Sequence, residues 1–367
     1  MGDRKFIPKY RRIYEDIRRG IRSGRYLPGA LLPCERELCG QYGVERITVR
    51  SALRLLAEEG LIVKKPGVGS FVSGSEAVPS PAGSGSATAL FLMSKSIDYI
   101  HSNSPGFNAL LFFPMEQLCR EKGISLMFRS CIEGDDIADI VSSSRAGFVF
   151  MVSTLPEHIY DEVYRIGIPA LCVNHYDRRF VSVMPDSKHS IREVISYLSS
   201  LGHKRIAFLN GLPAASNAVE RLHAFRCAMF EEKLTLDEGL IMEGDWTYNS
   251  GFACMTRLLD ERKNGCLPTA VVAGNDMIAI GCMEAIRSRG LRVPEDISVV
   301  GFDNIGMSRF CTPLLTTVSV DPVMMARVGV AQMMNLLDPS AFCVPCAIYP
   351  PAVLVKRESV CPPRAKE

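Results

Sequence analysis

Three arginines, Arg46, Arg50 and Arg54, follow one another at intervals of four residues. On an α-helix this spacing places them on one face, while Val49 and Leu53 fall on another. A stripe of guanidinium groups can bind the phosphates and base edges of DNA. An isolated stripe is more often a solvated surface, so the neighbouring segments must decide between the two interpretations.

The neighbouring segments predict a winged helix-turn-helix. Residues 33–38 begin with a proline suited to a first helical turn and carry two glutamates near that helix N-terminus. Residues 41–44 form a short turn with a glycine, and two short β-runs in residues 61–72 flank a basic, glycine-containing tip. For contacts with phosphates, base edges and the neighbouring minor groove we predict Arg36, Arg46, Thr48, Arg50, Lys64, Lys65 and the backbone of Gly67.

The charge of the chain is unevenly distributed. Residues 1–75 hold 15 Lys and Arg against 8 Asp and Glu, a net charge of +7, whereas the whole chain carries +2. The remainder therefore carries 2 − 7 = −5. A basic head on an acidic body is expected if only the head meets DNA phosphates.

Composition argues against secretion, membrane insertion and metal chemistry. Residues 1–12 are polar and basic, and no apolar run approaches the ~18 residues of a membrane span, so we expect a cytoplasmic protein. The 13 cysteines fall mostly in apolar segments, as reduced core residues do. Cys343 and Cys346 form a lone CxxC that we interpret as incidental, and no metal or cofactor is expected.

Residues 74–88 are rich in Ser, Gly, Pro and Ala and are typical of a flexible linker. We therefore predict a DNA-binding domain at 1–73 and an effector-binding and dimerisation domain at 89–367. In that second domain, short apolar runs alternate with amphipathic segments, which predicts an α/β fold with doubly wound parallel sheets in two lobes. The expected strands are 89–93, 125–129, 147–152, 170–173, 205–210, 270–273 and 297–302. The expected helices are 107–122, 155–166, 187–201, 217–232, 247–262 and 276–289.

Polar residues follow several predicted strands, where the carboxyl ends of parallel strands would form a ligand cleft. Asp186, Arg221, Asn275 and Asp303 are the candidates, whereas Asp276 is interpreted as a helix cap. A sugar site needs planar groups that bind vicinal hydroxyls and an aromatic plate for the sugar C–H face. An Asp or Asn in these positions is often only a cap, and Arg221 equally suits an ion pair or a sugar phosphate.

The order of residues in the head resembles the GntR family of bacterial repressors. The matching motifs run from Leu32-Pro33 with 35–38, through Arg46 and 48–50, to the wing at 67–72. Glu45 and Ile47 depart from the family pattern, and an apolar Ile47 suits contact with a thymine methyl.

The body is similar to the effector domain of lactose- and galactose-type repressors. The matching motifs lie at 199–208, 220–222, 273–276, 293–304 and 313–318. The whole chain thus resembles the arabinose-repressor arrangement. This resemblance implies that Asp186, Arg221, Asn275 and Asp303 contact a polyol and that Trp246 stacks on it. It also implies a contribution from residues 102–107 and crossings between the lobes near Gly202, Ser319 and Leu337.

Two function classes follow. The leading hypothesis is a ligand-responsive, sequence-specific transcriptional repressor, a homodimer that binds operator DNA and a sugar or sugar phosphate. The alternative is an enzyme, or another small-molecule-binding α/β protein, with a DNA-binding head. No GxGxxG follows a strand and opens a helix, and GxxxxGK[ST] and GxSxG are absent from the sequence. We therefore predict that the protein is not an enzyme.

Overall fold

A computed structural model describes residues 9–22, 25–26, 30–58, 61–65, 69–72, 87–94, 106–262, 267–338, 340–341 and 343–364. The chain divides into two compact units, Met1–Gly85 with Asp161–Ile168, and Ser86–Tyr160 with Pro169–Glu367. Below, the described residues 9–72 are called the head and those from 87 to 364 the body. Residues 74–86 of the predicted linker lie outside the described residues, and its last two residues begin strand β3.

The head is a winged helix-turn-helix, as predicted. Its elements are α1 (Lys9–Arg22), α2 (Glu35–Tyr42), α3 (Arg46–Glu58), β1 (Ile62–Lys65) and β2 (Gly69–Val72). The two strands pair antiparallel as the wing. Gly43 ends α2 with φ at 60°, a left-handed conformation that glycine adopts without a steric penalty. Ile17, Leu38, Val49 and Leu56 are fully buried and join the three helices in one apolar core.

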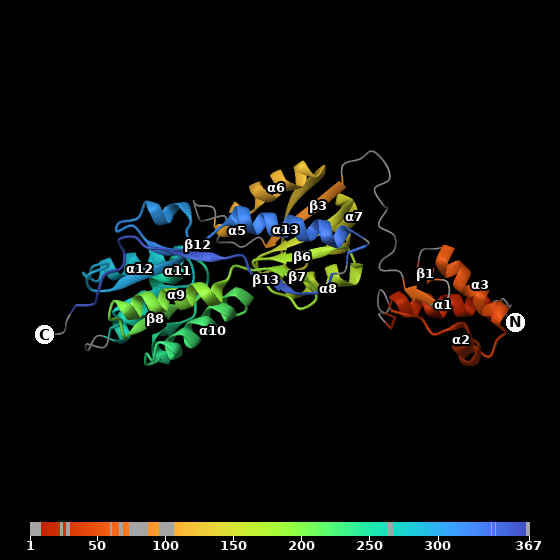
Figure 1. Cartoon of the computed structure of the whole chain (residues 1–367), viewed down its shortest axis with the longest axis horizontal. Coiled ribbons are helices and arrows are strands. Elements are labelled where there is room, and N and C mark those ends of the chain that lie inside the picture. Colours follow the sequence, from red (N-terminus) through yellow and green to blue (C-terminus); the bar gives the residue numbers. More distant parts are fainter. Residues whose placement is uncertain are drawn as a thin grey trace. The chain divides into compact units, whose positions relative to one another are not determined.

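Lobe 1 of the body is a parallel sheet with the strand order β13-β7-β6-β5-β3-β4 (Figure 1). Its strands are β3 (Ala87–Ser94), β4 (Ile124–Cys131), β5 (Ala146–Val152), β6 (Ala170–Val173), β7 (Val181–Val183) and β13 (Ala347–Ile348). Its helices are α5 (Phe107–Leu110), α6 (Phe112–Glu121), α7 (Ile137–Ser144), α8 (Glu157–Ile166) and α13 (Pro322–Leu337). Strands β5 and β6 are almost entirely buried apolar residues, as expected for a sheet covered on both faces.

Lobe 2 has the strand order β14-β12-β11-β10-β8-β9, parallel except for β14. Its strands are β8 (Ile206–Leu209), β9 (Ile241–Met242), β10 (Ala270–Ala273), β11 (Ser298–Asp303), β12 (Thr316–Val320) and β14 (Ala352–Val355). Its helices are α9 (Ser187–Ser200), α10 (Ser216–Glu231), α11 (Tyr248–Glu261) and α12 (Asp276–Ser288), with 3-10 turns η1 (Glu238–Leu240) and η2 (Gly306–Arg309). The doubly wound α/β architecture is confirmed.

The predicted strands and helices of the body all occur, but the prediction omitted several elements. The omitted strands are short or end the sheets: β7, β9, β12, β13 and β14. Helices α7 and α13 were also omitted, although Asp321 caps α13 and Pro322 occupies its first turn, which together are a recognisable start signal.

Two of the three predicted lobe crossings are wrong. The chain crosses between β7 and α9, at Asp321 between β12 and α13, and between β13 and β14. Only the crossing predicted near Ser319 agrees. Helix α9 packs on α10 and β14, so the chain has already reached lobe 2 before Gly202. Helix α13 packs on α6, β6 and β7, so the chain is still in lobe 1 at Leu337.

Helices α11 and α12 approach each other closely because glycines face the contact. A Cβ added to Gly251 would collide with the backbone of Ile278, and one added to Gly281 with the backbone of Tyr248 and Phe252. This contact sets the relative position of the first turns of α11 and α12. Among the described residues, no helix has the length and apolar character needed to cross a membrane.

We expect Gly281→Ala to destabilise the body by about 1–3 kcal/mol, because the added methyl overpacks a backbone–backbone contact. Thermal unfolding followed by circular dichroism should show a lower midpoint. Gly306→Ala is the matched control, since a Cβ there meets nothing within 4 Å. Equal midpoints for the two variants would contradict the close packing of α11 on α12.

Candidate functional site

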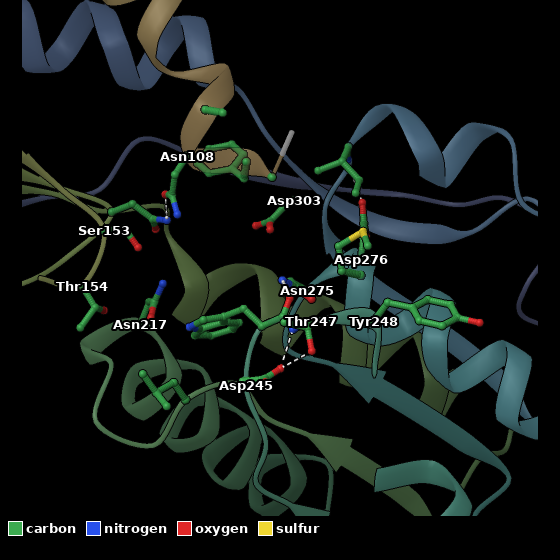
Figure 2. Close-up of a pocket in the computed structure, with 18 of the residues that line it drawn as sticks. Asn108, Ser153, Thr154, Asn217, Asp245, Thr247, Tyr248, Asn275, Asp276 and Asp303 are labelled. Atoms are coloured by element: carbon green, nitrogen blue, oxygen red, sulfur yellow. Dashed lines mark hydrogen bonds between the residues drawn. The ribbon is translucent and has the colours of Figure 1, made fainter. Parts of the chain in front are cut away.

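A cavity of about 620 Å³ opens between the two lobes of the body. Its walls are the ends of β3, β5 and β6 in lobe 1, and in lobe 2 the ends of β10 and β11, helix α10 and the segment before α11. Figure 2 shows Asp303, Asn275, Asn217 and Asn108 around this common space. The volume lies within the range of about 300–1,000 Å³ usual for small-molecule sites.

Arg221 and Asp303 form a buried ion pair in the lobe 2 wall. Arg221 Nη2 lies 3.6 Å from Asp303 Oδ1, and the side chains are 2% and 10% exposed. The guanidinium also donates to the carbonyl of Gly274 and lies 3.7 Å above the ring of Phe302. Burial raises the pKa of Asp303 to about 6, although the Arg221 charge opposes this shift. Desolvation therefore outweighs the attraction within the pair.

The backbone at Asp303 is unusual for a residue with a side chain. Asp303 has φ at 103° and Asn304 has φ at 55°, both in the left-handed region. Arg357 holds this turn, because its guanidinium donates to Asn304 Oδ1 and to the hydroxyl of Ser308. Such backbone strain persists where the surrounding contacts fix it, and it is common at functional sites.

The interpretation of Asp276 as a helix cap is wrong. Asp276 is fully buried and accepts hydrogen bonds from Ile305 N–H at 2.8 Å and from the Thr317 hydroxyl. Asn275 is the cap, with its Oδ1 2.9 Å from Ile278 N. Burial, with the nearby Asp303 carboxylate, raises the pKa of Asp276 well above its ordinary value. Sequence could not distinguish two adjacent capping residues, because which one precedes the first turn depends on where β10 ends.

Trp246 stands in the cavity wall because two glycines leave room for its indole. A Cβ at Gly211 would overlap the ring, and one at Gly274 would crowd it. Asn275 Nδ2 donates to the Trp246 carbonyl at 3.0 Å and so ties the aromatic residue to the end of β10. The Arg221 guanidinium lies 5.6 Å from the indole centroid. The indole of Trp246 and the Arg221–Asp303 ion pair are therefore neighbours.

Four of the five predicted ligand residues meet at the cavity: Arg221, Trp246, Asn275 and Asp303. Asp186 is not among the described lining residues; it caps α9, with its Oδ1 3.0 Å from His189 N. From the predicted segment 102–107, Gly106 and Phe107 line the cavity, and 102–105 lie outside the described residues.

The prediction missed a set of polar lining residues, Asn108, Asn174, Asn217 and Asp245. Asn174 Nδ2 donates to Asn108 Oδ1 at 2.8 Å across lobe 1. The buried amide oxygens of Asn174 and Asn217 have no hydrogen-bond partner, and neither has the buried Nε of Arg221. Two signals were available: Asn174 directly follows a predicted strand, and Asn217 precedes Arg221 by one helical turn.

Charge in the cavity is predominantly acidic. Arg221 is the one basic side chain among the described lining residues, and Asp303 already opposes its charge. Asp245 adds a carboxylate, which accepts from the Thr247 N–H at 2.7 Å. Among the described lining residues an anionic ligand would find no unopposed cation, whereas hydroxyl groups could satisfy the unpaired amide and guanidinium atoms. No cluster of three or more potential metal-ligating side chains occurs in the described part of the chain.

In the head, a single carboxylate holds two of the predicted DNA-binding arginines. Glu35 on α2 lies 2.5 Å from Arg46 Nε and 3.1 Å from Arg50 Nε, both on α3. These arginines hold the pKa of Glu35 below its usual value, Arg46 contributing most. Their side chains are still 68% and 58% exposed. The clamp restricts the guanidinium groups without removing them from solvent.

The remaining predicted DNA-binding residues are placed in part. Arg36 is exposed on α2, Thr48 is half-buried in α3, and Lys64 and Lys65 lie in β1 of the wing. Gly67 lies outside the described residues. Ile47 is 71% exposed beside the arginines, an unusual position for a large apolar side chain.

Residues 9–72 match the family described as "Bacterial regulatory proteins, gntR family", and residues 195–360 match "Periplasmic binding protein-like domain". The chain is 33% identical to the HTH-type transcriptional repressor PurR of Proteus mirabilis over 235 residues, 61% of this chain and 68% of PurR. It is 34% identical to the HTH-type transcriptional regulator AscG of Escherichia coli over 182 residues, which is half of this chain and 53% of AscG. The chain thus spans about half the length of AscG.

The fold is also similar to a solved structure, a sugar-binding transcriptional regulator of the LacI family from Escherichia coli in complex with phosphate. That structure superposes with a TM-score of 0.61 at 26% identity, covering 75% of this chain and 99% of that one. PurR, AscG and this LacI-family protein are all described as transcriptional repressors or regulators.

Asp303 should titrate near pH 6, because burial raises its pKa to about 6. Above this pH its carboxylate opposes the Arg221 charge next to the indole, and below it the proton removes that opposition. We expect the emission of Trp246, the one tryptophan of the chain, to shift with a midpoint near pH 6. Asp303→Asn should lack the transition, and Asp237→Asn should keep it. A transition that survives Asp303→Asn would assign it to another group.

Proposed function

Because this chain belongs to the PurR family of HTH-type transcriptional repressors, we propose that it is a ligand-responsive repressor. In this proposal the head binds an operator and the body senses a neutral polyhydroxyl compound. The observation that carries the proposal is the combination of two built sites in one chain. One is the arginine pair held by Glu35 on an exposed helix, and the other is the polar cavity around Trp246.

We propose that α3 enters the major groove of DNA. Arg46 and Arg50 then reach phosphates and guanine edges, and the clamp by Glu35 reduces the side-chain entropy that they lose on binding. Ile47 faces the same way as an apolar contact for a thymine methyl. Arg36, Thr48 and the wing with Lys64, Lys65 and Gly67 contact the backbone beside the groove.

We further propose that the repressor acts as a homodimer. A helix-turn-helix repressor reads a palindrome with two heads related by a twofold axis, so half-sites about 34–36 Å apart, or a multiple of this, are expected. The body supplies the contact between protomers, and the proposed linker at 74–88 lets each head reach its half-site.

For the effector, we propose a neutral sugar or related polyol rather than a sugar phosphate. The opposed charge of Arg221 and the carboxylates of Asp245 and Asp303 disfavour an added anion. Trp246 supplies a stacking plate, and Asp303 and the amides of lobe 1 supply partners for hydroxyl groups. Of the two ligand classes that Arg221 left open, the proposal therefore takes the neutral one.

An enzymatic role is the second candidate, and we do not propose it. The relatives PurR and AscG are regulators, and Arg221, the one basic side chain among the described lining residues, is already paired with Asp303. A repressor of this kind works where the chromosome lies, so we propose a cytoplasmic location.

Arg50→Ala should weaken operator binding by about 1–3 kcal/mol, because it removes a cation from the groove-facing helix. Glu35→Ala removes a negative charge near the DNA, yet it should also weaken binding because both arginines lose their clamp. Fluorescence anisotropy with a labelled operator duplex at several salt concentrations measures both effects. Arg289→Ala, which removes an exposed arginine of the body, is the control. Unchanged affinity in Arg50→Ala would remove Arg50 from the interface, and tighter binding by Glu35→Ala would reject the clamp.

A neutral sugar from a panel of mono- and disaccharides should change the emission of Trp246 saturably, whereas the corresponding phosphates should bind at least about tenfold more weakly. Asp303→Ala should abolish the response, since it removes the carboxylate that accepts from sugar hydroxyls and opposes the charge of Arg221. Asp237→Ala, an exposed carboxylate of the same lobe, should respond as wild type. Tighter binding of a phosphate would overturn the neutral-ligand proposal while leaving the repressor proposal intact.

A further inference from the structure

The hydroxyl of Ser216 joins the two lobes of the body by hydrogen bonds. The backbone N–H of Tyr176, in lobe 1, donates to Ser216 Oγ at 2.8 Å. The same Oγ lies 3.1 Å from His175 Nδ1. Ser216 is the first residue of α10 in lobe 2, whereas His175 and Tyr176 follow the end of β6 in lobe 1. One side chain therefore contacts both a backbone and a side-chain group of the opposite lobe.

Because the Tyr176 N–H can only donate, Ser216 Oγ accepts that bond. The direction of the bond between Ser216 Oγ and His175 Nδ1 depends on which ring nitrogen of His175 carries the proton. His175 is 8% exposed and its ring stacks on Tyr160, with centroids 4.9 Å apart. Burial lowers the pKa of His175 to about 4, so the ring is neutral at pH 7, and Nδ1 accepts from or donates to Ser216 Oγ according to the tautomer.

On each side, the contact between Ser216, His175 and Tyr176 is linked to residues that line the cavity. On the lobe 1 side, the Tyr160 hydroxyl donates to the carbonyl of Ser153 at 3.1 Å and accepts from Leu155 N–H at 3.0 Å. Ser153 lines the cavity (Figure 2). On the lobe 2 side, Ser216 begins the helix that carries Asn217 and Arg221, which both line the cavity. Ser216, His175 and Tyr160 themselves are not among the described lining residues.

We propose that Ser216 is a positioning residue that ties the ligand-binding face of α10 to lobe 1. It fixes Asn217 and Arg221 relative to Ser153 without touching the ligand. A motion that separates the start of α10 from the end of β6 must stretch or break the two hydrogen bonds of Ser216. The proposal goes beyond the proposed function, because it depends on neither the operator nor the identity of the effector.

Hydrogen exchange measured on the full chain without ligand tests whether Ser216 holds α10 to lobe 1. We expect the Tyr176 amide, followed by mass spectrometry of peptides that span residues 174–180, to exchange roughly three- to tenfold faster in Ser216→Ala. Ser216→Thr retains the hydroxyl and should restore the wild-type rate. Ser288→Ala is the matched control, because its hydroxyl bonds to Ala285 O within its own helix. An unchanged Tyr176 rate in Ser216→Ala would overturn the tie, as would failure of Ser216→Thr to restore it.

The fluorescence emission of Trp246 reports the position of α10 independently of hydrogen exchange. Arg221 lies 5.6 Å from the indole, so a shift of α10 should change the emission of unliganded Ser216→Ala, and Ser216→Thr should return it to the wild-type value. Faster exchange at Tyr176 with unchanged emission would show a hydrogen bond that does not position α10, and would reject the proposal. Neither measurement uses DNA or sugar, so failure here leaves the proposed repressor function standing.

Discussion

The body is organised around the buried charge of Arg221. A guanidinium that is 2% exposed is costly to desolvate, and it is retained only with partners placed accurately. Those partners come from the ends of two neighbouring parallel strands, the Gly274 carbonyl after β10 and the Asp303 carboxylate at the end of β11. The register of the lobe 2 sheet therefore determines whether the charge is satisfied.

Several otherwise unrelated features serve this pair. The left-handed backbone at Asp303 and Asn304 turns the carboxylate toward Arg221, and Arg357 holds the turn from the C-terminal segment. The carboxylate of Asp276 accepts a hydrogen bond from the backbone N–H of Ile305, the residue after Asn304, and so also holds this turn. The glycines at 211 and 274 leave the indole of Trp246 its place beside the guanidinium. A charged group, a strained turn and an aromatic plate thus form one unit at the strand ends, and lobe 1 contributes amides to its other side.

The head uses the same physical principle at an exposed site. Glu35 restricts two arginines that remain in solvent, so their charges stay available while their conformational freedom is reduced. In the body an opposite charge neutralises a buried cation, and in the head an opposite charge orders exposed cations. The difference in exposure explains why one arginine forms the wall of a binding cavity and the others suit a polyanionic partner.

The sequence by itself determined the features that local spacing encodes: the arginine face of α3, the glycine corner at Gly43, the alternation of strands and helices, and the polar residues after β10 and β11. It did not determine which of Asn275 and Asp276 caps α12, that Asp186 stays a cap, or that Asn174 and Asn217 face the cavity. Nor did it determine that Glu35 clamps Arg46 and Arg50, or that Ser216 meets His175. The two caps depend on where a strand ends and its helix begins, and the other contacts join residues apart in the chain, whose geometry follows from sheet order, helix packing and burial. Only the tertiary structure decides those.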